Sequence, residues 1–240
     1  MTTHLDSSLH AEPHFSSFGG RLNALRAAVL GANDGIVSVS AVVVGVAGAS
    51  NTKSFILTAG VAALVAGALS MAVGEYISVS AQRDTEKALL KKERFELDNY
   101  PEQELEELVG LYAKKGLSRA TAEIVARELT EHDAFAAHVD AELGIDPHNL
   151  TNPWHAAYAS GAAFLFGAII PIAAVILSSA SLRIPMTFIS VIIALMITGG
   201  LSAYAGGAHK LIAMGRVVLG GVLAMVVTYG VGILFGVAGI

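Results

Sequence analysis

The chain has no cysteine, one tryptophan and few charged residues for its length. Of its 240 residues, 15% are charged and 54% are hydrophobic, whereas soluble domains carry about 25% charged residues. The absence of cysteine excludes disulfide bonds and thiolate metal sites. The low charge and the mean hydropathy of +0.61 indicate an integral membrane protein.

The N-terminal stretch, residues 1–20, is polar and has no hydrophobic periodicity. A secretory signal peptide would open with basic residues followed by an apolar core, and this stretch has neither. His4, His10 and His14 offer weak metal ligands, but we predict that residues 1–20 form a disordered tail.

Five apolar stretches are each long enough to cross a bilayer as a helix, which takes about 20 residues. They are Ala27–Ala49, Phe55–Val79, Ala156–Ser178, Met186–Ala208 and Val217–Ile240. Pro171 interrupts the third stretch, and we expect it to kink that helix. The pattern predicts an all-α membrane protein with five transmembrane helices.

The basic residues are distributed unevenly about these spans. If the spans alternate in direction, 13 of the 15 basic residues fall on one side, and only Lys53 and Arg183 fall on the other. Because Lys and Arg are enriched in cytoplasmic loops, we predict that the N-terminus and the connection between spans two and three are cytoplasmic. The membrane would be a bacterial inner membrane, or an organelle membrane in a eukaryote.

The acidic residues are concentrated between spans two and three. Sixteen of the 20 lie from Asp84 to Asp146, so the net charge of −5 describes this insert and not a surface for nucleic acid. The predicted organisation is a tail at 1–20, spans one and two at 21–82, a cytoplasmic helical metal-binding insert at 83–150, and spans three to five at 151–240.

Residues typical of helix ends divide the insert. Residues 83–97 continue span two as a helix, and Pro101 then opens a helix predicted at 102–115. Gly116 ends that helix and Ser118 caps the next, predicted at 119–130. A last helix at 132–143 is closed by Gly144.

Asp34 lies inside the first apolar span. An ionisable group at membrane depth is costly and commonly marks an ion or proton site. Met71 and Glu75 are four residues apart in span two and share one helix face. Two carboxylates and a thioether favour Fe²⁺ or Mn²⁺ over Ca²⁺ and Mg²⁺. A carboxylate away from water tends to hold a proton that a metal displaces, so these residues predict metal–proton exchange.

Each of these three residues also has a simpler interpretation. Asp34 would anchor its helix near the lipid headgroups, Met71 would fill space in the packing, and Glu75 would make a structural hydrogen bond.

In the insert, glutamates recur three residues apart, a spacing that places both on one helix face. The pairs are Glu93/Glu96, Glu104/Glu107 and Glu128/Glu131, and His138 and Glu142 form a further pair four residues apart. Such pairs on neighbouring helices can hold a metal. Charged helices are more commonly solvated, and the spacing alone favours that interpretation. The insert has no Glu-x-x-His motif, which disfavours a di-iron oxidase.

Three segments resemble the vacuolar iron transporter family. They are GANDGIVS in span one, GALSMAVGEYISVSAQRD in span two and NPWHAAYASGAAF at the start of span three. The resemblance extends from Arg21 to the C-terminus. It implies a homodimer in the lipid bilayer that moves Fe²⁺, and in many members Mn²⁺, out of the cytosol in exchange for protons.

The resemblance also implies roles for individual residues. Asp34 and Met71 match the translocation path, and His138 stands where the family has a methionine ligand. The residues that match the family's cytoplasmic metal ligands are Glu93, Glu96, Glu104, Glu107 and Glu142. Zn²⁺ is a further candidate for the insert. Neither an enzyme activity nor a prosthetic group is implied.

We therefore predict a transporter of Fe²⁺, Mn²⁺ or both that serves metal homeostasis and detoxification. The alternative is a membrane-anchored metal-binding sensor or scaffold without transport activity.

Overall fold

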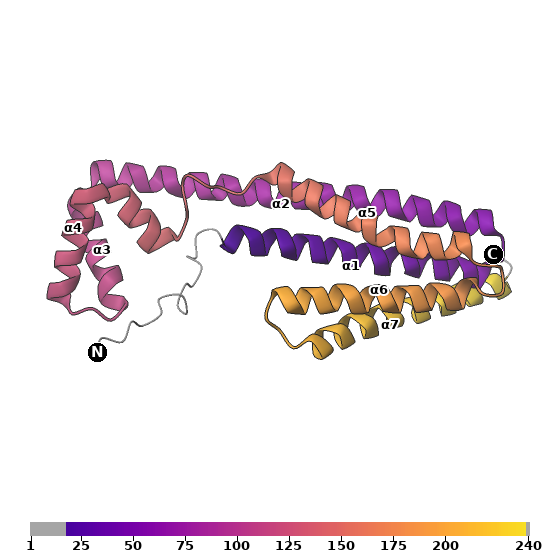
Figure 1. The fold of residues 1–240 in the computed structure, drawn as a ribbon. Coiled ribbons are helices and arrows are strands. Elements are labelled where there is room, and N and C mark those ends of the chain that lie inside the picture. The colour runs from indigo at the N-terminus through magenta and orange to yellow at the C-terminus, as the bar shows by residue number, and fades with distance from the viewer. Residues whose placement is uncertain (1–17, 239–240) are drawn as a thin grey trace, which may run out of the picture. The chain divides into compact units, whose positions relative to one another are not determined.

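The computed structural model describes residues 18–238, in which every regular element is a helix (Figure 1). The helices are α1 (Phe18–Ala49), α2 (Lys53–Asn99), α3 (Pro101–Lys114), α4 (Arg119–His138), the π-helix η3 (Val139–Leu143), α5 (Pro153–Leu177), α6 (Arg183–Ala205) and α7 (Lys210–Ala238). The prediction of an all-helical chain is confirmed for these residues.

Five of the described helices are long and apolar enough to cross a membrane, in agreement with the five predicted spans. Two helix starts differ from the predicted spans by more than three residues. Helix α7 begins at Lys210 and not at Val217, because a helix end accepts charged residues that an apolar span excludes. Helix α1 begins at Phe18, so residues 18–20 are helical, and the rest of the predicted disordered tail lies outside the described residues.

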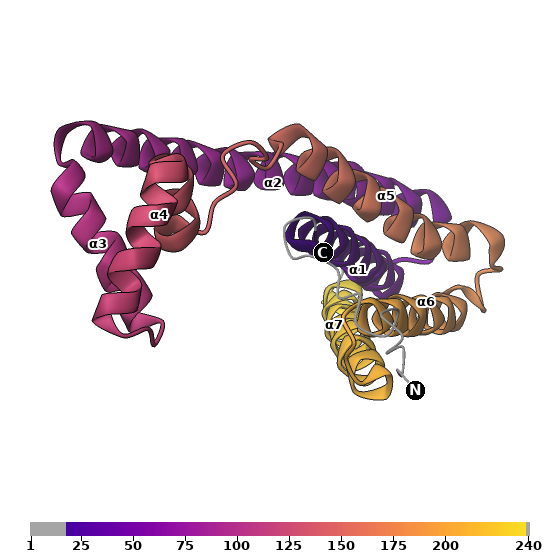
Figure 2. The ribbon, with the colours of Figure 1, turned by 60° about the vertical axis from the view of Figure 1, so that its left-hand side comes forward.

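The chain divides into two compact units. One combines the described residues up to Tyr76 with those from Pro153 onward, and the other is Ile77–Asn152. In the first unit, α1 lies between α5 and the α6–α7 pair (Figures 1 and 2). Its apolar side chains belong to two clusters, one shared with α2 and α5 and the other with α6 and α7. Helix α1 is therefore the centre of this unit.

Glycines allow α1, α2 and α5 to pack closely. A Cβ on Gly35 of α1 would collide with the backbone of Phe164 on α5, and a Cβ on Gly167 of α5 would collide with the backbone of Ala32. The Phe164 ring fills the space that a side chain at Gly67 of α2 would need. Small residues let membrane helices approach one another in this way.

The two basic residues predicted to lie opposite the other 13 are found at the same end of the first unit. The Lys53 ammonium donates to the carbonyl of Ile176 near the end of α5, at 2.7 Å. Arg183, at the start of α6, donates to the carbonyl of Asn51 at 3.2 Å. These hydrogen bonds connect helix ends and links that are distant in the sequence.

Aromatic side chains gather where α2 leaves the first unit and α5 begins. The rings of Tyr76 and Trp154 have centroids 4.7 Å apart, and those of Trp154 and Tyr158 are 5.9 Å apart. Trp154 and Tyr158 are exposed. Exposed Trp and Tyr are typical of the membrane–water interface, so we take the apolar part of α2 to end near Tyr76.

The second unit is built on the antiparallel pair α3 and α4. Its small core contains Leu108 and Val109 of α3 and Ala122 and Ala126 of α4. Pro101 is the first residue of α3, and Gly116 has φ +103° just after that helix ends. These boundaries confirm the predicted helix.

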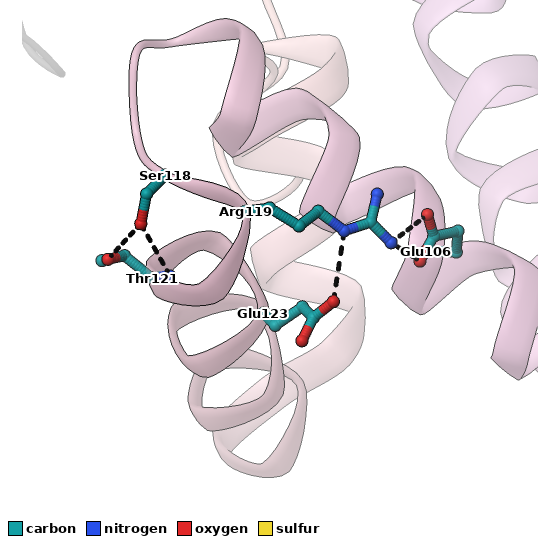
Figure 3. Close-up of polar contacts among 5 residues, drawn as sticks. All are labelled: Glu106, Ser118, Arg119, Thr121 and Glu123. Atoms are coloured by element: carbon teal, nitrogen blue, oxygen red, sulfur yellow. Dashed lines mark hydrogen bonds and ion pairs between the residues drawn. The ribbon is translucent and has the colours of Figure 1, made fainter.

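Polar contacts stabilise the start of α4 and connect it to α3 (Figure 3). The Ser118 hydroxyl accepts a hydrogen bond from the Thr121 amide, as predicted for an N-cap. Arg119 donates to Glu106 of α3 at 2.6 Å and to Glu123 one turn along α4 at 3.1 Å.

Helix α4 is interrupted where the sequence predicts a boundary between two helices. Asp133 has extended backbone angles, φ −161° and ψ 96°, and its carboxylate accepts a hydrogen bond from the amide of Ala136 at 2.9 Å. The helical segment then continues through His138 into η3 and ends at Gly144, which has φ +60°. The predicted segment 132–143 is thus a separate helical piece, residues 134–143, that begins after Asp133.

We expect Gly167→Ala to lower the thermal midpoint of the detergent-solubilised protein by several degrees. Overpacking of this kind costs about 1–3 kcal/mol. Gly220→Ala in α7 is the matched control, because nothing lies within 4 Å of its Cβ position. Equal midpoints for the two variants would show that the α1–α5 contact is not tight.

Candidate metal centre

Three potential metal ligands from three helices meet inside the second unit. They are Glu93 of α2, Glu104 of α3 and His138 at the end of α4, and their exposed fractions are 2%, 6% and 0%. Each offers one ligand atom within 4.8 Å of the other two, and this is the one such group of three among the described residues.

The ligand atoms are close together, and those of Glu93 and His138 lack hydrogen-bond partners. Nδ1 of His138 lies 3.0 Å from Oε1 of Glu93 and 3.6 Å from Oε2 of Glu104. Oε1 of Glu93 and both ring nitrogens of His138 are buried without a hydrogen bond. A buried polar atom without a partner is costly, and a bound cation would satisfy all three residues at once.

This group lies well beyond the apolar part of α2. Seventeen residues of helix from Tyr76 to Glu93 cover about 25 Å. The whole of α2, with 47 residues, would extend about 70 Å, more than twice the thickness of a bilayer core. A bilayer core that ended near Tyr76 would therefore leave Glu93 outside it.

Burial shifts the pKa of all three residues in the direction that favours the uncharged form. It raises the pKa of Glu93 from its ordinary 4.5 to about 7, and the charges of Glu142 and Glu104 add to the shift. Burial, then the charges of Glu107 and Glu96, raises the pKa of Glu104. Burial lowers the pKa of His138, against a smaller opposing effect of Glu142 and Glu107. The imidazole is therefore neutral at pH 7, which is the form that binds metals.

The remaining predicted ligands of the insert lie around this buried group. Glu96, Glu107 and Glu142 influence its pKa values, as described above, and are more exposed than Glu93 and Glu104. Glu96 pairs with Lys92 at 2.7 Å. The structure thus gathers the six candidate residues of the insert into one acidic cluster with three members buried.

The pair Glu128/Glu131 does not belong to this cluster. Both residues are exposed on α4, and neither is part of the group of three buried ligands. For this pair, the interpretation as a solvated helix surface fits the structure.

The three residues of the predicted membrane site are partly buried. Asp34 is partly buried in α1, and it accepts a hydrogen bond from the Ser38 hydroxyl at 2.6 Å. Met71 packs against the apolar cluster of α1, α2 and α5, and Glu75 is partly buried. Neither Asp34 nor Glu75 belongs to a group of three His, Asp or Glu ligands in the described part of the chain.

The polar residues beside Asp34 are not among the predicted ligands. Ser38 lies four residues after Asp34, a spacing that indicates contact on a helix. The Thr198 hydroxyl of α6 donates to the side-chain oxygen of Asn33 at 2.6 Å. This second contact joins positions far apart in the chain, so local spacing contains no signal for it.

Five apolar helices and a separate helical unit define an integral, multi-pass membrane protein. Its candidate metal centre has oxygen and nitrogen donors, which suit divalent first-row metals.

The comparisons with known proteins identify the family. Residues 25–233 match the VIT family, and the chain belongs to it. This is a family of transporters and not of enzymes, in agreement with the predicted absence of enzyme activity.

Named relatives cover nearly the whole chain. A "Vacuolar iron transporter" of Acanthamoeba castellanii is 46% identical over 234 residues, which is 95% of this chain and 84% of the relative. "Vacuolar iron transporter homolog 1" of Oryza sativa subsp. japonica is 35% identical, over 93% of this chain and 79% of the relative. "Vacuolar iron transporter homolog 2" of Arabidopsis thaliana is 33% identical, over 93% and 90%.

The raised pKa of Glu93 predicts how pH affects the metal-free protein. The folded protein holds this proton up to about pH 7, whereas the unfolded chain loses it near its ordinary 4.5. The stability that the proton contributes is therefore complete below the unfolded-state pKa of 4.5 and is lost as the pH rises through the folded-state pKa of about 7. We expect Glu93→Gln to raise the thermal midpoint in EDTA at about pH 8, and the gain to vanish near about pH 4.

Glu128→Gln is the control for this measurement, because Glu128 is exposed and lies outside the cluster. It should follow the wild-type pH dependence. A Glu93→Gln curve parallel to that of the wild type would contradict the raised pKa.

Proposed function

We propose that this chain moves Fe²⁺, Mn²⁺ or both out of the cytosol in exchange for protons. The second unit would lie in the cytosol and capture the ion, and residues of the apolar helices would pass it through the membrane. Membership of the VIT family and the names of the relatives support iron as the substrate. The buried group of Glu93, Glu104 and His138 is the observation that carries the capture step.

The donor chemistry of this group fits such a substrate. Two carboxylates and a neutral imidazole supply oxygen and nitrogen ligands, which suit Fe²⁺ and Mn²⁺ and also Zn²⁺. Glu96, Glu107 and Glu142 would complete the coordination or attract the ion as it approaches. Because the pKa of Glu93 is about 7, this carboxyl is protonated part of the time in neutral solution, and a metal would displace its proton.

Asp34, Met71 and Glu75 would form the route through the membrane. Asp34 is a carboxylate in an apolar helix, and a polar residue beside it already donates a hydrogen bond. Met71 and Glu75 share one face of α2, and Met71 lies at the cluster that α1, α2 and α5 build together. The two carboxylates would release protons when a divalent ion binds and take them up when it leaves, and the thioether would add a neutral ligand.

The cytoplasmic position of the second unit is supported by charge. Lys53 and Arg183 lie together at one end of the first unit, whereas the other 13 basic residues, among them Lys210 at the start of α7, fall on the opposite side if the spans alternate in direction. The end with more positive charge would face the cytosol.

We also propose that the protein is a homodimer. One side of α2 packs on α5 through Gly67 and Gly161. Another side presents exposed apolar residues at intervals of four, namely Val61, Val65, Leu69 and Val73. A second copy of the chain would cover this stripe in part, and lipid would cover the remainder.

Removing one buried carboxylate should weaken capture. We expect Glu104→Gln to raise the dissociation constant of the purified full-length protein for Mn²⁺ by about tenfold or more. Isothermal titration calorimetry would measure it, with Glu128→Gln as the matched control from the exposed pair. Equal affinities for the two variants would rule out the buried group as the capture site.

Transport itself is tested in proteoliposomes with an imposed pH gradient. We expect wild-type protein to accumulate Fe²⁺ and Mn²⁺ against the proton flow, and Asp34→Asn to abolish this flux while metal binding by the second unit persists. Metal flux that does not depend on the pH gradient would refute proton exchange. Binding without any flux would favour the alternative, a membrane-anchored metal sensor or scaffold.

A further inference from the structure

Helix lengths alone would not bring His138 to Glu104. Arg119, the first residue of α4, donates to Glu106 of α3, so the neighbouring Glu104 lies nearer the start of α4 than its end. At 1.5 Å per residue, His138 would lie about 28 Å from that start in a straight α4. A straight helix would therefore carry His138 well past Glu104. In the structure, however, their ligand atoms are 3.6 Å apart.

The break at Asp133 resolves this mismatch. Its backbone is extended, so α4 stops there and the chain changes direction before residues 134–143 resume a helix. The Asp133 carboxylate accepts a hydrogen bond from the amide of Ala136, in the manner of an N-cap. This cap stabilises the start of the new segment, whose other end is Gly144 in the left-handed conformation.

Residues 134–143 carry two of the cluster's side chains. His138 and Glu142 are four residues apart and thus share one side of the segment. Ala137 and Ala141, the residues just before them, pack against the core of α3 and α4. One side of the segment is therefore anchored while the neighbouring side faces Glu93 and Glu104.

A second contact connects the start of this segment to α2. The Arg94 guanidinium lies over the ring of Phe135, 4.4 Å from its centroid. Arg94 follows Glu93 directly, and Phe135 lies one turn before His138. The segment is thus held beside the helix that supplies Glu93.

Asp133 is itself exposed and is not one of the three clustered ligands. We infer that Asp133 is a positioning residue for the metal cluster: by ending the first part of α4 and capping residues 134–143, it directs His138 and Glu142 towards Glu93 and Glu104. This inference rests on the proposed function of the cluster as the capture site.

The test separates the cap from the negative charge. Asp133→Asn removes the charge and keeps a capping side chain, whereas Asp133→Glu keeps the charge and is a poor cap. Asp133→Ala removes both. We expect the Ala and Glu variants to raise the dissociation constant of the full-length protein for Co²⁺ and Mn²⁺ by about tenfold, the size typical of residues that orient metal ligands. The Asn variant should stay within about twofold of wild type.

The visible absorption spectrum of bound Co²⁺ provides a readout of ligand geometry. It should change in the Ala and Glu variants and remain wild-type in the Asn variant. Ser118→Ala is the matched control for lost stability, because Ser118 caps the other end of the same helix α4 (Figure 3). It should lower the thermal midpoint as Asp133→Ala does while it leaves Co²⁺ binding intact.

Three results would overturn the inference. Wild-type affinity and spectrum in Asp133→Ala would mean that the cap does not position the cluster. An equal loss of Co²⁺ and Mn²⁺ affinity in the Asn, Glu and Ala variants would mean that the geometry of the cap does not position the ligands. If wild-type protein bound no Co²⁺ or Mn²⁺, or if Glu104→Gln bound them as wild type does, the proposed capture site itself would fail. If Asp133→Ala does not fold, the comparison of the Asn and Glu variants decides.

Discussion

The close approach of α1 to its neighbours is the contact on which the arrangement of the apolar helices depends. Apolar side chains gain little by leaving lipid for one another, so membrane helices associate through tight van der Waals packing. Gly35 and Gly167 provide that packing between α1 and α5, and Gly232 of α7 lies directly against the backbone of Gly45. Because each contact involves backbone atoms, no side-chain rotation can relieve an added methyl group.

The second unit is held together differently, and its cluster opposes its stability. A core of only four buried apolar residues, Leu108, Val109, Ala122 and Ala126, has to support two carboxyl groups and an imidazole that are removed from water. Burial raises the pKa of both carboxyls and lowers that of the imidazole, so the empty cluster favours its uncharged forms. Such a cluster is costly as a structural element and well suited to a cation that replaces protons.

Much of the fold could be predicted from the sequence because it depends on local chemistry. The apolar runs gave the five long helices, Pro101 and Gly116 gave the limits of α3, and Ser118 gave the start of α4. Each of these signals acts within a few residues. The sequence misplaced the start of α7 and extended the predicted tail into α1, because charged or small residues at a helix end do not by themselves mark the boundary.

Which side chains are available as ligands, and which of them share a helix face, follows from the order of residues along the chain. Which of them are removed from water depends on how the helices pack in space. Glu93 and Glu104 are buried while Glu96 and Glu107, three residues further along the same helices, are more exposed. The difference depends on where neighbouring helices lie, and for His138 it also depends on the change of direction at Asp133. Burial is a property of segments that meet in space, so no spacing within one helix could have given it.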